Sequence, residues 1–384
     1  MNCDLIQRMI SIREELHRIP EIAGKEVKTA AVIRRELAKI PGIRILKPFL
    51  ETDTVAFIDG KAPGKNVTLR ADIDALAVTE ETGAEFASGI PGMMHACGHD
   101  VHTAILLGAA EVLAARRGEF AGSIRLVFQP GEESKAMARD LIAAGALLEP
   151  VPDFSAALHV EPGLPAGTVG VKNGCMASSC IHFKVEFTGR GGHGSLPHLS
   201  RNPVLAAVSA VNELQYVVTN WIDVQKPAVI SICNINGGQM DNVIPESCTF
   251  GGTLRSLDNE TAGELRDALQ SICQGAAALH RVRCDIRFSG DYPAVINTDS
   301  GVKIACQAAE AAGLPVHNLS ESAMSSEDFS CFMLSSRDGV FIRLGAGEDQ
   351  PPLHNVKFLP PPEVVDAGIR YMTSVALTAL GSQE

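Results

Sequence analysis

Short apolar segments alternate with helical segments along most of this sequence. The strand candidates are residues 66–71, 123–128, 154–158 and 340–344, and apolar residues recur at helical spacing in 5–16, 29–40, 103–115 and 137–148. A chain whose strands alternate with helices forms an α/β domain, with a central, mostly parallel sheet flanked by helices. This alternation predicts the fold class of most of the chain.

The middle of the chain follows a different pattern. Residues 181–187 alternate strictly between apolar and polar, which is typical of a half-buried strand. A helical segment from Pro203, two strand-like segments and a second helical segment follow, before a last strand at 283–288. This β-α-β-β-α-β order is that of a ferredoxin-like unit. We therefore predict an inserted α+β domain at residues 180–291, within a discontinuous α/β domain of residues 1–179 and 292–384.

Charge and composition exclude several classes of partner. The chain has 384 residues and a formal net charge of −12, whereas binding nucleic-acid phosphates requires clustered lysine and arginine. It contains no run of about 18 apolar residues, so no membrane span is expected. Charges interrupt the N-terminal segment, which argues against a signal peptide. The ten cysteines then indicate thiols in a reducing compartment, and we expect the protein in the cytoplasm.

Polar side chains gather where the predicted strands end. In an open α/β sheet, ligands bind beyond the carboxyl ends of the strands. The residues that follow a predicted strand are Asp72, Asp74, Glu132, Glu133, His159 and His354. A glycine-containing turn before a helix adds His95, Cys97, His99, Asp100 and His102. All of these side chains could converge at one edge of the sheet.

Imidazole, thiolate and carboxylate groups together suit zinc or a similar divalent first-row ion. Five or more such groups exceed what one tetrahedral ion needs, which favours two ions that share a ligand and a water. Of the adjacent glutamates, Glu132 and Glu133, one can bind metal while the other acts as general base.

Each residue also has a simpler interpretation when it is taken alone. Cys97 would be a buried apolar thiol, His159 a structural histidine, and the glutamate pair part of a solvated loop. Asp72 and Asp74 could cap a turn. The shared position at strand ends favours the common site over these separate explanations.

Several motifs carry a family resemblance that spans almost the whole chain. They are residues 69–74 (LRADID), 92–102 (GMMHACGHDVH), 129–133 (QPGEE), 189–193 (GRGGH), 242–245 (NVIP), 326–329 (SEDF) and 353–354 (LH). In this order they resemble the aminoacylase/carboxypeptidase family of dinuclear metallohydrolases. The branch is that of hippurate hydrolases, N-acyl amino acid amidohydrolases and auxin-conjugate hydrolases.

The resemblance implies roles for individual residues. The implied metal ligands are Cys97, His99, Glu133, His159 and His354, with Cys97 as the bridge. Glu132 would be the general base and Asp74 would orient a ligand. In the inserted domain, a lid and dimerisation element by the same resemblance, His193 would stabilise the oxyanion, while Asn242 and Arg255 would hold the substrate. Zinc or manganese would occupy the site, with cobalt or nickel as alternatives.

The residues and the resemblance together therefore predict an enzyme that hydrolyses the amide bond of a small N-acyl amino acid or dipeptide, with a metal-bridged water as the nucleophile. The resemblance alone implies that it is a homodimer. A dipeptidase or carboxypeptidase, a deacetylase of N-acetyl-diaminopimelate type and a structural metal-binding protein are the alternatives. Residues 189–194 (GRGGHG) also fit the dinucleotide fingerprint G-x-G-x-x-G. No helix is expected to follow them directly, so we do not expect a dinucleotide there.

Overall fold

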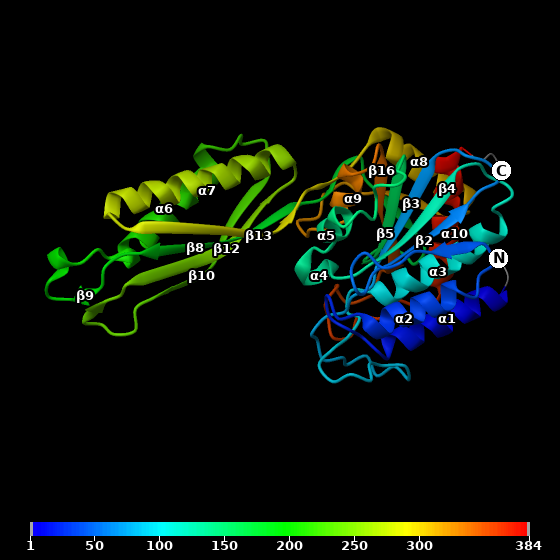
Figure 1. The fold of residues 1–384 in the computed structure, drawn as a ribbon, viewed down its shortest axis with the longest axis horizontal. Helices are drawn as coiled ribbons and strands as arrows, with labels where there is room; N and C mark the ends of the chain where they lie inside the picture. The colour runs from blue at the N-terminus through cyan, green and yellow to red at the C-terminus, as the bar shows by residue number, and fades with distance from the viewer. Residues whose placement is uncertain (1–2, 382–384) are drawn as a thin grey trace. The chain divides into compact units, whose positions relative to one another are not determined.

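The structure, a computed structural model, describes residues 3–381, which form two compact units. The first unit contains the chain up to Met176, Ile296–Glu321 and the chain from Asp328 onward; the second contains Ala177–Val295 and Ser322–Glu327. The second unit is thus slightly wider than residues 180–291 and includes the short later segment Ser322–Glu327. Its strands and helices lie in the green to yellow part of the ribbon (Figure 1).

The first unit is built on an eight-stranded, mostly parallel sheet with the order β1-β2-β4-β3-β5-β16-β6-β15. Its strands are β1 (Ile43–Ile45), β2 (Thr54–Asp59), β3 (Asn66–Asp72), β4 (Ser123–Gln129), β5 (Phe154–Pro162), β6 (Val169–Val171), β15 (Val316–Asn318) and β16 (Gly339–Gly347). The central pairs β4-β3, β3-β5 and β5-β16 are parallel, while β1-β2, β2-β4 and β16-β6 are antiparallel. Parallel strands are covered on both faces, and every residue of β3 is buried. The predicted fold class is confirmed.

Helices of the first unit cover this sheet. They are α1 (Cys3–His17), α2 (Val27–Leu37), α3 (His99–Ala115), α4 (Glu132–Lys135), α5 (Ala138–Ala143), α8 (Asp299–Ala311), α9 (Ser330–Leu334) and α10 (Glu363–Leu380). Helix α3 packs against α1, α10 and β3, and α10 also packs against α8. Leu69, Leu106 and Ile342 are fully buried in the resulting core. Among residues 3–381, no helix combines the length and apolar content that crossing a membrane requires.

The second unit has a four-stranded antiparallel sheet with the order β10-β12-β8-β13. Its elements are β8 (Ser179–Thr188), β9 (Gly192–His193), a 3-10 turn (Pro197–Leu199), α6 (Pro203–Asn220), β10 (Ala228–Gly237), β11 (Val243–Ile244), β12 (Ser247–Ser256), α7 (Asn259–His280) and β13 (Arg283–Tyr292). The chain order β8-α6-β10-β12-α7-β13 gives the ferredoxin-like unit. Strands β7 (Gly174–Ala177) and β14 (Val295–Asn297) pair with each other where the chain passes between the units.

Two element boundaries differ from the sequence expectation for local reasons. The helix expected at 137–148 is only α5, Ala138–Ala143, because Gly145 has a φ of +101° and turns the backbone. Strand β5 extends to Pro162, so His159 lies within the strand rather than at its end. Strand β5 still pairs with β16 at this position, where His159 is opposite Arg343.

Candidate metal centre

The turn before α3 places two potential ligands side by side. Cys97 precedes the helix and His99 is its first residue, while Gly98 between them is left-handed with a φ of +83°. A Cβ on Gly98 would lie 2.5 Å from Cγ2 of Val160 on β5. Glycine therefore provides both the backbone conformation and the close approach to β5 that this turn needs.

The five predicted ligand side chains meet in the first unit. Cys97 Sγ lies 3.3 Å from His159 Nε2. Glu133 Oε1 lies 3.7 Å from His99 Nε2 and 3.3 Å from His354 Nε2. Ligand atoms of Cys97, His99 and His159 lie within 4.8 Å of one another, as do those of Cys97, Glu133 and His354. Two overlapping ligand sets that share Cys97 match the requirements of a two-ion centre.

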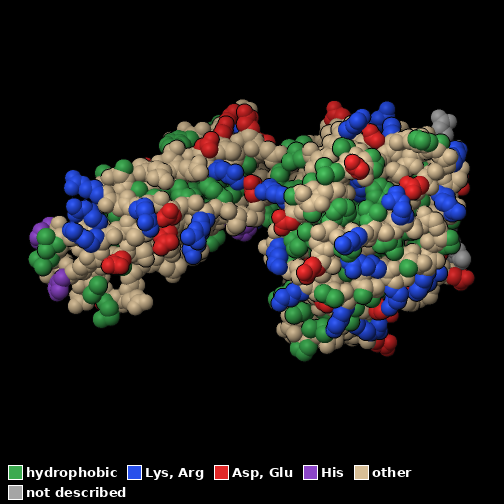
Figure 2. Space-filling view, in the orientation of Figure 1, with side chains coloured by type: hydrophobic (Ala, Val, Ile, Leu, Met, Phe, Trp, Pro, Cys, Tyr) green, Lys and Arg blue, Asp and Glu red, His purple; other side chains and the backbone are tan. Residues whose placement is uncertain are grey.

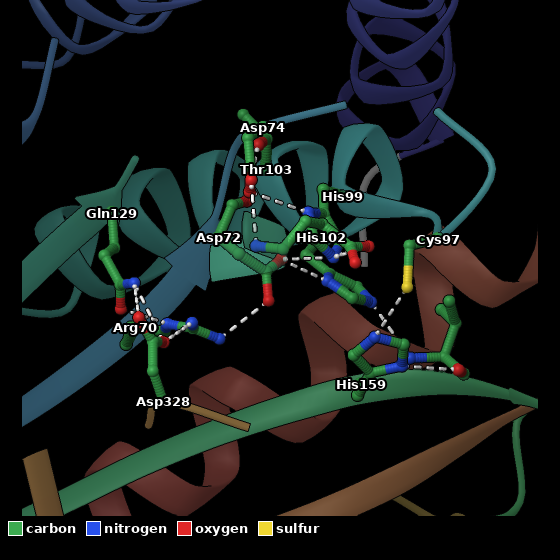
Figure 3. A network of polar contacts seen from close by, with 12 residues as sticks. Arg70, Asp72, Asp74, Cys97, His99, His102, Thr103, Gln129, His159 and Asp328 are labelled. Carbon is green, nitrogen blue, oxygen red and sulfur yellow. Dashed lines mark hydrogen bonds and ion pairs between the residues drawn. The ribbon is translucent and has the colours of Figure 1, made fainter. Parts of the chain in front are cut away.

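Other contacts orient the ligand nitrogens toward this point. His159 Nδ1 lies 2.7 Å from the Val160 carbonyl oxygen, and His99 Nδ1 lies 3.2 Å from Asp74 Oδ1. The Nε2 atom of each ring therefore faces the cluster, and Figure 3 shows the His159 ring directed toward the Cys97 sulfur. Such bonds to the second ring nitrogen are usual for metal-binding histidines.

One buried ring nitrogen of the cluster, His99 Nε2, has no hydrogen-bond partner within the described part of the chain. Glu133 Oε1 is also buried, and His354 Nε2 lies 3.3 Å from it. Buried polar atoms are rarely left without a partner unless an ion or water satisfies them. Together with the thiol, imidazole and carboxylate donors, these atoms fit divalent metal ions.

The protonation of the cluster depends on burial and on its carboxylates. Burial, with Glu133 and Glu132 nearby, raises the pKa of the Cys97 thiol. Burial lowers the pKa of His159. Burial also disfavours charge on His99, but Asp72 and Asp74 outweigh it and raise the pKa of that imidazole to about 10. Ion binding must therefore displace protons from Cys97 and His99.

His354 reaches the cluster from a strained loop. Its φ is +67°, which is uncommon for a residue with a side chain, and its N–H donates to the Ala96 carbonyl oxygen at 2.8 Å. Such conformations persist where surrounding structure fixes them and often occur at functional sites. The bond to Ala96 connects this loop to the Cys97 turn.

A buried polar network behind the cluster extends the site beyond the predicted ligands. Asp72 Oδ1 lies 2.5 Å from His102 Nδ1, and His102 Nε2 accepts the Val160 N–H. Both nitrogens of His102 are thus engaged, so His102 orients the chain rather than binding metal. Arg70 donates to Asp72 and to Asp328 at 2.7 and 2.8 Å (Figure 3). The signal in the sequence that points to this network is the three-residue spacing of His99 and His102 at a helix start.

The three remaining predicted residues lie in the second unit. Residue His193 of β9 pairs with Val243 of β11, and the Gly194 N–H donates to the Asn242 carbonyl oxygen at 2.8 Å. His193 and Asn242 are therefore neighbours. Arg255 lies at the C-terminal end of β12 and donates to the Met324 carbonyl oxygen at 2.7 Å.

Comparisons with known proteins agree with this arrangement. The profile of Peptidase family M20/M25/M40 matches residues 68–378. N-acetylcysteine deacetylase of Bacillus subtilis (strain 168) is 35% identical over 97% of this chain and 97% of its own length. Thermostable carboxypeptidase 1 of Saccharolobus solfataricus is 34% identical over 94% of this chain and 92% of its own length.

A solved structure from Bacillus subtilis, described as a dinuclear metal-binding peptidase of the M20 family, is similar over the whole fold. It is 31% identical with a TM-score of 0.85, and the match covers 100% of both chains. The profile match includes most of the chain, and the relatives align over nearly their full length. The chain therefore belongs to the M20/M25/M40 peptidase family and is a metal-dependent amide hydrolase.

Proposed function

We propose that this protein hydrolyses the amide bond of N-acyl amino acids, with Glu132 as the general base. The observation that carries the proposal is a carboxylate additional to the five ligands. A carboxylate oxygen of Glu132 lies within 4.8 Å of the ligand atoms of His99 and Glu133. A structural metal site needs no such group, because its ligands close the coordination shell.

The ligands proposed for two divalent ions are Cys97, His99, Glu133, His159 and His354. The ions would polarise the scissile carbonyl and lower the pKa of a water molecule to near neutrality. A thiolate beside imidazoles favours zinc, and manganese, cobalt and nickel are the alternatives to test.

The protein's own groups would carry the protons. Glu132 takes a proton from the attacking water and returns it to the departing amine nitrogen. We assign oxyanion stabilisation to the His193 imidazole, which supplies a donor. Asn242 and Arg255 are assigned to the substrate, since an amide and a guanidinium suit the carboxylate of an amino acid.

The first test replaces the base with its amide. In Glu132→Gln, kcat should fall about 10²–10⁴-fold while two metal ions per chain are retained, because only the proton transfer is removed. Turnover is measured by amine release and metal content by mass spectrometry. Glu133→Gln is the matched control and should lose metal. Full activity in the Glu132→Gln variant would reject this assignment.

The substrate class rests on two relatives whose names describe a deacetylase and a carboxypeptidase. Both reactions break an amide next to an amino acid. We propose N-acyl amino acids as substrates and keep peptides as the second candidate. Apoprotein reloaded with one metal at a time should release amine faster from N-acetyl or N-benzoyl amino acids than from dipeptides. A preference for dipeptides would favour the second candidate.

We also propose a homodimer formed through the second unit. Strand β10 forms one edge of the sheet and runs for ten residues, and such an edge is a template for pairing with another chain. Leu205, Val208 and Tyr216 of α6 expose apolar side chains on the same unit. Figure 2 shows hydrophobic side chains among charged ones on the visible face of the second unit.

The cytoplasm is the proposed location, because a reducing environment keeps the Cys97 thiol available to metal.

A further inference from the structure

Glu26 is a fully buried carboxylate that lies just before α2 and contacts the turn of the general base. Its Oε1 accepts the Gly131 N–H at 3.0 Å and the Gly24 N–H at 2.8 Å. Its Oε2 accepts the Thr52 hydroxyl at 2.9 Å. The bond to Gly131 joins residues 105 positions apart in the chain.

Gly131 controls the direction in which the chain enters α4. It is left-handed, with a φ of +66°, and Glu132 and Glu133 follow it directly. A Cβ at this position would lie 2.4 Å from Met137 Sδ, and the Gly131 carbonyl oxygen accepts from the Met137 N–H. The backbone at Gly131 therefore has little freedom while its N–H is held.

Carboxylates hold the turn on both sides of Glu132. Glu26 accepts the N–H of Gly131, and Asp74 Oδ2 accepts the N–H of Glu133 at 3.0 Å. Asp74 also contacts the metal-ligand candidate His99. The hydrogen-bond partners of the Glu26 carboxylate are Gly24, Thr52 and Gly131. Of these three partners, Gly131 is the one that directly precedes Glu132, so the Gly131 N–H is the route by which Glu26 acts on the position of Glu132. Glu26 also interacts electrostatically with Asp74.

We propose that Glu26 is a positioning residue that aims the Glu132 carboxylate by fixing the Gly131 N–H. The inference depends on the proposed function, since it requires Glu132 to be the general base. Charged acceptors make stronger bonds than neutral ones to backbone N–H groups. A small misplacement of a catalytic group is enough to cost a large part of the rate.

Two substitutions of Glu26 distinguish the loss of the hydrogen bond to Gly131 from the loss of the negative charge. In Glu26→Ala, the Gly131 N–H loses its acceptor, and kcat should fall roughly 10²-fold with KM little changed. In Glu26→Gln, the amide oxygen can still accept from Gly131, and kcat should stay within about tenfold of the parent. Both are assayed at saturating metal, with bound metal and thermal unfolding measured on the same samples.

Glu21→Ala is the matched control. Glu21 lies in the same segment and accepts the N–H groups of Lys28 and Thr29 at the start of α2, at 2.8 and 2.9 Å. This control should lower the melting temperature but leave kcat near the parent value, because the turn keeps Glu26. An equal loss of kcat in Glu21→Ala and Glu26→Ala would reduce the role of Glu26 to general stability and overturn the proposal.

A double-mutant cycle with Glu132→Gln tests the route of the effect. If Glu26 acts through Glu132, adding Glu26→Ala to Glu132→Gln should cost no more than about twofold in kcat. If the fold-losses in kcat of the two single variants multiplied in the double variant, the positioning role would be overturned. An active Glu132→Gln enzyme would reject the proposed function itself. An inactive Glu132→Gln enzyme beside a fully active, folded Glu26→Ala variant would reject the positioning role alone.

Discussion

Asp74 connects two parts of the metal centre through its two oxygens. Oδ1 contacts His99 Nδ1, and Oδ2 accepts the Glu133 N–H. It is buried at the end of the segment that follows β3. One carboxylate thus orients an imidazole and the backbone of a carboxylate ligand.

Removing this carboxylate should weaken metal binding more than it weakens the fold. In Asp74→Ala, we expect metal affinity to fall about 10–100-fold, because His99 Nδ1 loses the carboxylate that orients its ring. Titration against a chromogenic chelator measures the affinity. The control is Asp59→Ala, since Asp59 is exposed and pairs with Arg44 on the surface. Equal affinities in both variants would contradict the orienting role.

His17 contributes a pH-dependent part of the stability, away from the five ligands. It is buried and contacts Asp100 and Glu80 at 2.9 and 3.2 Å. Burial by itself would lower its pKa, but these carboxylates raise it from 6.5 to about 9. The folded state therefore binds a proton more tightly than the unfolded state. This stabilisation is complete below pH 6.5 and is lost as the pH rises through 9.

We expect His17→Gln to remove this pH dependence. The difference in unfolding free energy between parent and variant should shrink by about 3 kcal/mol between roughly pH 6 and pH 10. Urea denaturation at several pH values, with a thiol reductant present, measures it. A difference that stays constant across this range would show that His17 is not charged in the folded protein.

The sequence singles out candidate ligands more readily than the residues that orient them. The glycine-containing turn before a helix singles out His99, and the position after a predicted strand singles out Glu133, because both lie near elements with clear apolar patterns. Glu26 shows no such signal, and the spacing of His99 and His102 indicates a polar network without identifying the partners of His102. The contacts of Glu26 and His102, with Gly131 and with the Val160 N–H, join residues far apart in the chain and depend on the packed sheet.

At the level of elements, the start of α3 depends on one glycine. Gly98 has a positive φ, and a Cβ added to it would point at the Val160 side chain. At Gly118, in the turn after the same helix, an added Cβ would meet no atom of the described chain within 4 Å, and its φ is not positive. The two glycines form a natural comparison.

Gly98→Ala should destabilise the protein by about 2–4 kcal/mol, from the left-handed backbone and the contact with Val160. It should also lower metal content, because Cys97 and His99 flank the altered residue. Gly118→Ala should stay within about 0.5 kcal/mol of the parent. Chemical denaturation and metal analysis give both quantities, and equal stability of the two variants would contradict the close packing at Gly98.

The sequence predicts long buried elements and misses short marginal ones. Strands β3 and β4 have seven residues each and are buried almost throughout, so apolar residues recur along them often enough to be recognised as strands. Strands β1, β6 and β15 have three residues each, which is too short for a period to be recognised. They form because neighbouring strands offer unpaired main-chain groups, which is a tertiary effect.

At the level of the whole molecule, the proposed dimer can be tested on α6. Val208 is 44% exposed on the same helix as Leu205 and Tyr216. In Val208→Glu, a charge would have to be buried in the interface, so dimer affinity should fall at least about tenfold. Analytical ultracentrifugation measures the dissociation constant. The control is Leu148→Glu, at an exposed leucine of the first unit, which should leave the dissociation constant unchanged. Equal dissociation constants in the two variants would place the interface elsewhere.

The first unit is split in sequence, since it closes only with the chain from Asp328 onward. Four of the five proposed ligands precede the second unit, whereas His354 follows it. During synthesis on the ribosome, most of the second unit emerges while the first still lacks β16 and α10. A nascent chain that has not reached residue 354 therefore lacks one of the five proposed ligands. We expect the complete proposed centre to bind its ions only after that residue has left the ribosome.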